Sequence, residues 1–358
     1  MAFIGTILRE LVKRKRTKFS SKSLTDPFAQ QKIVLTRLLN KAQHTEFGKA
    51  YEFGKILDDT GMMERFRNSV PVYNYESIYK EWWHRILNDE ENICWPGRIK
   101  YYALTSGTAS SASKRIPVSR SMVNTMRKAS IRQIFTLAEM DLPPDLYQKS
   151  VLMMGGTINL TPVGQHYEGD LSGILTGRLP GWFNPFYKPG RQIAAIKDWT
   201  AKLEKITENA HKWDIGAMAG VPAWIQIIME KIIAHYKLDN IHDLWPNLSV
   251  YVHGGVSFEP YRKSIPKLLG KPIHYLETYL ASEGFLAFEY ALGRNMQLVL
   301  DLGIFFEFVP FTEKNFLPDG EMTPNPETLL INEVKEGVDY AILISTTDQD
   351  SVKLDKII

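Results

Sequence analysis

Nine small residues, 105–113, consist only of Ser, Thr, Gly and Ala, and the run ends at Lys114. Hydroxyl groups and unobstructed backbone N–H groups hold phosphates well, and a lysine adds a mobile positive charge. The run lies between two extended segments, 99–104 and 116–117. It therefore predicts a phosphate-binding loop, with a flexible Ser-rich linker as the alternative. A Walker A loop is excluded, because the Gly-Lys-Ser/Thr ending is missing.

Two more polar turns follow predicted strands. The strand 249–253 runs into Gly254 and Gly255, and the strand 272–279 runs into the turn 281–284. In an open α/β sheet, ligands bind beyond the carboxyl ends of the strands. The two turns and the small-residue loop are therefore predicted to share one crevice.

The side chains of the last turn suit a nucleotide. Tyr279 offers a face for stacking on a purine, and the bare backbone of the preceding glycine turn suits the purine edge. Ser282 offers a hydroxyl and Glu283 a single carboxylate. Magnesium keeps several waters and takes only one or two carboxylates, so Glu283 is a candidate Mg²⁺ contact, with a helix cap as the alternative. Together these residues predict a nucleoside triphosphate site.

Strands and helices alternate from about residue 99 to 290, which predicts an α/β sheet with helices on both faces. Helices are predicted over 26–42, 121–139, 193–211 and 222–236. The first is capped by Asp26 and buries Ile33, and the second buries Ile134. The segment 159–190 is rich in Gly, Pro and aromatic residues and predicts an irregular pocket wall or a surface loop.

From about residue 298 the pattern changes to β. Strands are predicted over 298–309, 328–334 and 340–345, with 336–339 as the turn of a hairpin. The expected fold class is therefore α/β, with mixed sheets flanked by helices and a β-rich part at the end.

Composition narrows the classes of function. The 358 residues hold 43 basic and 40 acidic side chains, which leaves no broad basic surface for nucleic acid. A single cysteine, Cys94, excludes an internal disulfide framework and indicates a reducing, cytoplasmic setting. Residues 1–25 form an amphipathic segment with a basic cluster at 13–16. That segment predicts a docked helix, with weak contact to a membrane surface as the alternative.

Several motifs in order resemble one family. Thr105-Ser-Gly-Thr108 with Lys114, Tyr279-Leu-Ala-Ser-Glu283 and the strand at 305–310 are similar to the Gretchen Hagen-type acyl acid–amido synthetases. This auxin-responsive family belongs to the firefly-luciferase-like adenylate-forming superfamily, and its bacterial branch is the most similar. The resemblance runs from about residue 30 to 346.

The resemblance implies a role for each site residue. Phosphates are held by Thr105, Ser106, Gly107, Thr108 and Lys114. Adenine is lined by Gly254, Gly255 and Val256 and stacked on Tyr279. Ser282 contacts the α-phosphate and Glu283 holds the magnesium, so the implied catalytic residues are Lys114, Ser282 and Glu283.

The resemblance also implies the reaction. ATP and a carboxylic acid give an acyl-adenylate, and an amine, usually an amino acid, then captures the acyl group with Mg²⁺ present. Residues 26–346 correspond to the family's large domain, and 347–358 lack its Gly-Asp turn, so the large domain alone is expected. The alternatives are a non-catalytic nucleotide- or acyl-binding relative and a ligase that passes the acyl group to coenzyme A.

Overall fold

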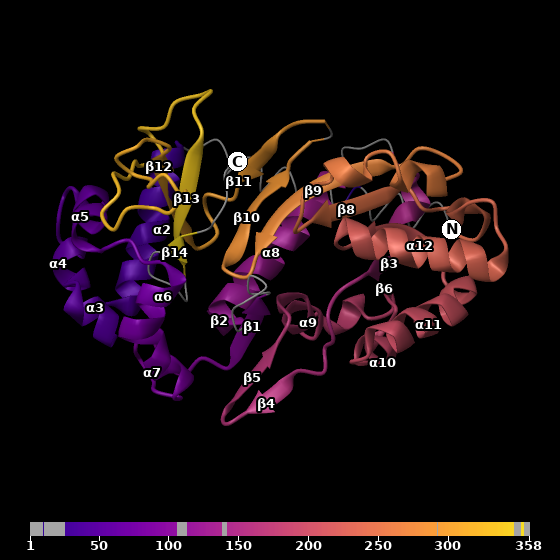
Figure 1. Cartoon of the computed structure of the whole chain (residues 1–358), viewed down its shortest axis with the longest axis horizontal. Coiled ribbons are helices and arrows are strands. Elements are labelled where there is room, and N and C mark those ends of the chain that lie inside the picture. The colour runs from indigo at the N-terminus through magenta and orange to yellow at the C-terminus, as the bar shows by residue number, and fades with distance from the viewer. Residues whose placement is uncertain are drawn as a thin grey trace.

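A computed structural model describes Glu10 and residues 26–105, 113–137, 142–291, 293–346 and 352–353. Three β-sheets lie among helices, and a seven-stranded sheet crosses the middle (Figure 1). Its order is β11-β10-β9-β8-β7-β3-β6. The strands are β3 Ser150–Met153, β6 Tyr187–Lys188, β7 Ile215–Ala219, β8 Val250–Gly254, β9 His274–Ala281, β10 Gly284–Glu289 and β11 Met296–Leu298.

The direction of these strands decides where a site can form. Strands β6, β3, β7, β8 and β9 pair in parallel, whereas β10 and β11 pair antiparallel. The five parallel strands therefore end at the same edge of the sheet, which is where ligands bind in such sheets. The predicted mixed α/β fold is confirmed, and the expected strands at 249–253 and 272–279 are β8 and β9.

Helices cover both faces of this sheet. Helices α11 (Trp199–Asn209) and α12 (Pro222–Tyr236) pack in one apolar cluster with Met218 and Tyr251 of the sheet. Helix α8 (Arg120–Thr136) contacts β10. Two short helices, α9 (Leu171–Thr176) and α10 (Arg191–Ala194), lie between β5 and α11 along the chain.

A four-stranded sheet carries the ends of the small-residue loop. Its order is β2-β1-β5-β4, formed by β1 Tyr101–Thr105, β2 Lys114–Val118, β4 Thr161–Val163 and β5 His166–Gly169. The expectation that 159–190 is irregular was wrong, because this segment supplies β4, β5, α9 and β6. Strands this short, one of them fully exposed, leave no alternating apolar pattern to detect.

The amino-terminal part is helical: α2 Pro27–Ala42, α3 Glu46–Ala50, α4 Phe53–Leu57, α5 Met62–Ser69, α6 Tyr75–Ile78 and α7 His84–Leu87. The predicted cap of α2 is confirmed, since Asp26 accepts from the Ala29 N–H at 3.0 Å. The expected core positions of Ile33 and Ile134 were wrong, because these side chains are 51% and 44% exposed. Two glutamines, Gln31 and Gln133, are buried instead.

Gln31 is buried because it completes the edge of another sheet. Strands β12 (Ile304–Pro310), β13 (Tyr340–Thr346) and β14 (Val352–Lys353) form a three-stranded sheet with β12 at its edge. The Gln31 amide accepts from the Phe306 N–H at 2.7 Å and donates to the carbonyls of Ile304 at 3.0 Å and Leu300 at 2.7 Å. The Gln31 side chain thus supplies hydrogen bonds that a neighbouring strand would otherwise make to the edge of β12.

The predicted strand over 328–334 was wrong. Only an isolated bridge joins Leu329 to Phe308 among the described residues, and the carboxylate of Glu333 caps a turn by accepting from the Leu330 N–H at 2.6 Å. Such local bonding competes with a strand. The hairpin expected at 336–339 is also wrong, because β13 pairs antiparallel with β12, with Ile304 opposite Thr346. In the part of the chain that the structure describes, no helix combines the length and apolarity needed to span a bilayer.

Candidate functional site at the carboxyl edge of the large sheet

The turn after β8 lies beside the end of β9. Gly254 pairs with Thr278 in the parallel β8–β9 ladder, one residue before Tyr279. A Cβ atom at Gly254 would lie 2.2 Å from the Thr278 carbonyl oxygen, so this close approach requires glycine. Gly255 follows with φ of +83°, and Val256 is 50% exposed. The backbone predicted to meet a purine is therefore accessible at this edge.

Ser282 and Glu283 form the two-residue turn that joins β9 to β10, because Ala281 pairs with Gly284. Both side chains are half-buried. Burial raises the pKa of Tyr279, and the nearby Glu283 carboxylate raises it further. The phenol therefore stays neutral at neutral pH, which suits a ring that stacks on a base.

The histidine before the glycine turn is also uncharged. His253 is buried, and its ring stacks on Phe258 with centroids 4.4 Å apart. Burial lowers its pKa to about 4, and the positive charge of Arg262 contributes. Among the described residues, His253 Nδ1 has no hydrogen-bond partner. The carboxyl end of β8 thus contributes aromatic surface and backbone groups rather than charge.

Helix α8 fixes the end of β9 through a side chain that the sequence argument missed. Gln133 Nε2 donates to Thr278 Oγ1 at 2.6 Å and to the Glu277 carbonyl at 3.3 Å. The sequence does indicate this position, because Gln133 lies on the same face of the helix as Met126 and Ala129, which are both buried. This contact positions the strand immediately before Tyr279.

The ends of the small-residue loop meet at the hairpin of β1 and β2. Thr105 pairs with Lys114, whereas Ser106, Gly107 and Thr108 lie outside the described residues. The Lys114 Nζ atom lies 3.4 Å from Glu76 Oε1 and 5.0 Å from the ring centroid of Tyr75. The described side-chain contacts of Lys114 are therefore with helix α6.

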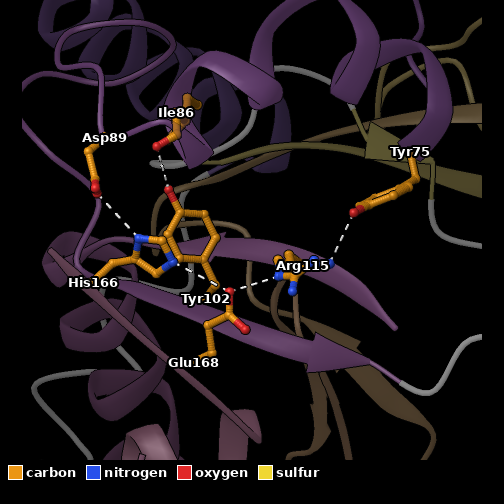
Figure 2. Close-up of polar contacts among 7 residues, drawn as sticks. All are labelled: Tyr75, Ile86, Asp89, Tyr102, Arg115, His166 and Glu168. Carbon is orange, nitrogen blue, oxygen red and sulfur yellow. Dashed lines mark hydrogen bonds and ion pairs between the residues drawn. The ribbon is translucent and has the colours of Figure 1, made fainter. Parts of the chain in front are cut away.

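A buried polar network lies next to this hairpin. Figure 2 shows the His166 ring between two carboxylates, with Nδ1 3.3 Å from Asp89 and Nε2 3.4 Å from Glu168. The same Glu168 oxygen accepts from Arg115 Nε at 2.7 Å. Asp89, Arg115 and the strand β5 that carries His166 and Glu168 come from separate segments of the chain, and none of these four residues was predicted from the sequence. The pairing of β1 with both β2 and β5 brings Arg115 next to Glu168.

A magnesium ion fits the donors at this edge only as a partner of bound phosphates. Among the described residues, no cluster of three or more His, Cys, Asp or Glu side chains could form a dedicated metal site. The β9–β10 turn instead offers the single carboxylate of Glu283. One carboxylate together with substrate phosphates is a usual environment for Mg²⁺.

Known structures share this architecture. The GH3.15 acyl acid amido synthetase in complex with 2,4-DB superposes with a TM-score of 0.77 at 13% identity, covering 96% of this chain and 67% of that chain. A 2-hydroxyisobutyryl-CoA ligase bound to 2-HIB-AMP and CoA gives 0.56 at 14% identity, covering 90% and 61%. No curated protein matches at the level of sequence. The fold is that of adenylate-forming enzymes, and the chain spans about two thirds of the length of these two.

The family follows from the sequence domains. Residues 16–164 and 157–273 match the GH3 family N-terminal domain, and residues 297–348 match the GH3 family central domain. Together these matches cover most of the chain. The protein belongs to the GH3 family, which confirms the resemblance found in its motifs.

Proposed function

We propose that this GH3 protein is an ATP-dependent ligase that activates a carboxylic acid as an acyl-adenylate and transfers the acyl group to an amine such as an amino acid. The observation that carries the proposal is the pairing of Gly254 with Thr278. This pairing sets the two predicted nucleotide turns side by side at the carboxyl edge of the sheet, in a chain with the fold of adenylate-forming enzymes.

In the proposed reaction, a carboxylate oxygen of the acid attacks the α-phosphorus of ATP and the bond to pyrophosphate breaks. The amine then attacks the acyl carbonyl carbon, loses a proton and displaces AMP. The protein contributes mainly position and electrostatics in such a reaction. Tyr279 stacks on the adenine, the backbone of 254–256 lines it, and Ser282 contacts the α-phosphate.

The loop residues and Lys114 supply the positive and hydrogen-bonding groups for the phosphates. Thr105, Ser106, Gly107 and Thr108 offer hydroxyl and N–H donors, and Lys114 leaves Glu76 to meet the triphosphate. Glu283 would hold Mg²⁺, which when bound neutralises phosphate charge.

Lys114→Ala is expected to weaken ATP binding by about ten- to a hundredfold, because a charge-assisted contact contributes about 1.5–3 kcal/mol. Adenosine affinity should stay unchanged, since only phosphates meet the ammonium group. Calorimetric titration of both ligands measures the difference. Equal losses for ATP and adenosine would remove Lys114 from the phosphate site.

Glu283→Gln is expected to leave adenosine binding intact and to raise the Mg²⁺ concentration needed for half-maximal ATP binding. The amide keeps the size of the side chain but loses its charge. Titrating Mg²⁺ at a fixed ATP concentration measures the shift. Glu259→Gln is the control, because Glu259 is a carboxylate in an exposed ion pair with Arg262. An unchanged magnesium requirement would make Glu283 a structural residue.

The activity itself is tested by acid-dependent exchange of pyrophosphate into ATP. Exchange that needs a carboxylic acid, followed by amide formation when an amino acid is added, supports the proposal. Formation of a thioester with coenzyme A in place of the amide would favour the CoA-ligase alternative. Nucleotide binding without any exchange across a panel of acids would favour the non-catalytic alternative.

A further inference from the structure

The segment between α9 and α10, residues 177–190, carries the most exposed large apolar side chain among the described residues. This segment, called the aromatic loop here, includes Trp182, which is 69% exposed. The ring of Trp182 meets Phe183 edge-on with centroids 5.7 Å apart, and Phe183 in turn lies 6.5 Å from Phe186. One exposed apolar residue alone indicates nothing, so its support and its surroundings decide what it can do.

The aromatic loop is held in shape by cationic side chains. Arg191, the first residue of α10, donates from Nε to the Asn184 side chain at 3.3 Å. Its Nη1 and Nη2 atoms donate to the carbonyls of Gly177 and Leu179 at 3.2 and 3.4 Å. Lys188 donates to a further carbonyl of the loop at 3.0 Å. The exposed tryptophan is therefore presented on a supported loop, and the charges that support it lie at the loop itself.

These charges have no carboxylate partner. Four basic residues lie within or just after the aromatic loop and form no ion pair among the described residues: Arg178, Lys188, Arg191 and Lys197. No acidic residue occurs anywhere from 171 to 197. Of the two that bound this stretch, Asp170 interacts with the buried Lys202, and Asp198 caps α11. The stretch therefore carries charge of one sign only.

The neighbouring hairpin of β4 and β5 adds a second exposed aromatic ring. The Arg178 guanidinium lies over the ring of Tyr101 at 4.8 Å, and Tyr101 stacks on Tyr167 with centroids 6.2 Å apart. Tyr167 is 46% exposed. Helix α9 and the hairpin lie next to each other at the lower edge of the view in Figure 1. Exposed rings and unpaired cations thus occur together at this end of the protein.

We propose that the aromatic loop and Tyr167 form a surface that binds anionic lipid bilayers. Tryptophan and tyrosine favour the boundary between water and lipid, because the ring is apolar and its polar atom stays hydrated. Basic side chains are attracted to an anionic leaflet. A leaflet of uniform negative charge fits charge of one sign better than a protein surface does, because protein surfaces normally present both signs. The inference does not depend on the ligase activity.

The test is sedimentation of the 358-residue chain with vesicles of phosphatidylcholine, with and without phosphatidylserine. Trp182→Gln is expected to weaken binding to the phosphatidylserine vesicles about tenfold, because it removes the most exposed ring. The double variant Lys188→Gln/Lys197→Gln should weaken that binding about ten- to thirtyfold and should hardly affect binding to pure phosphatidylcholine. Raising the salt concentration should act in the same direction as the double variant.

Matched variants away from the loop serve as controls. Phe311→Gln removes another exposed ring, which is 42% exposed, and Lys212→Gln/Lys231→Gln removes two exposed lysines of the α11–α12 region. Both should leave vesicle binding unchanged. Brominated lipids quench tryptophans that enter the bilayer, so the quenching seen in wild type should be lost in Trp182→Phe although seven of the eight tryptophans remain.

Three outcomes would overturn the proposal. Absence of binding to both kinds of vesicle would favour an acidic protein as the partner. Binding that is lost when the basic cluster at 13–16 is replaced by glutamine, but is unchanged in the loop variants, would assign membrane contact to the amino-terminal segment. Equal losses in the loop variants and in the Phe311 and Lys212/Lys231 controls would show attraction without a defined surface.

Discussion

Replacing Gln31 by Met is expected to lower the free energy of unfolding by about 3 kcal/mol or more. Methionine matches the volume of glutamine but cannot serve the backbone groups at the edge of β12. The N–H of Phe306 and the carbonyls of Ile304 and Leu300 would each lose the partner that they now have. A buried polar group left without a partner costs about 1–3 kcal/mol.

Urea denaturation of both proteins measures this loss. Lys32→Met, at the next and exposed position of α2, is the control and should change the stability by no more than about 0.5 kcal/mol. A loss below about 1 kcal/mol for Gln31→Met would show that water enters and replaces the side chain at the strand edge.

Glu307→Gln is expected to stabilise the protein above pH 7 and to have little effect near pH 4. Glu307 is 5% exposed, and burial raises the pKa of its carboxyl from 4.5 to about 7. The folded state therefore binds this proton more tightly than the unfolded state, so stability falls as the pH rises from about 4.5 through 7. The full difference corresponds to about 3 kcal/mol.

Glutamine removes the titration but keeps the hydrogen bond, since its amide oxygen can still accept from the Thr328 hydroxyl, now at 3.0 Å. Urea midpoints measured from pH 4 to pH 8.5 should diverge between wild type and variant as the pH rises. Glu327→Gln, which removes an exposed carboxylate paired with Lys314, should show no such divergence. Parallel curves for Glu307→Gln and wild type would mean that Glu307 is ionised without cost.

The strand-end turns could be predicted because each joins two strong local signals. An apolar run precedes Gly254, and another precedes Ser282, so strand, end and polar turn are all visible in a few residues. Helix caps are equally local, as Asp26 shows. The short strands β4 and β5 could not be predicted, because β5 pairs with β1, about 60 residues earlier, and β4 pairs with β5.

Most of the important side chains that could not be predicted from the sequence are buried polar residues. Gln31 and Glu307 look like surface residues, since the groups that satisfy Gln31 lie 269 to 275 residues away and the hydroxyl that satisfies Glu307 belongs to Thr328, 21 residues later. The contact between Arg115 and Glu168 could not be predicted for the same reason. Residues that contribute to the candidate site through their own chemistry, such as Tyr279 and Lys114, were visible, whereas those that position others were not.

The contact between Gln31 and β12 also sets an order of events during synthesis. Helix α2 leaves the ribosome 275 residues before Phe306, and translation takes on the order of tens of seconds to cover that length. During this time α2 can pack on α4, its neighbour in the fold, but its glutamine must stay hydrated. The contact between α2 and β12 is therefore expected to form last. Nascent chains stalled before residue 304 should be cut by a protease within α2. Chains released after residue 346 should resist this cleavage. Equal resistance at both lengths would show that α2 reaches its final place without β12.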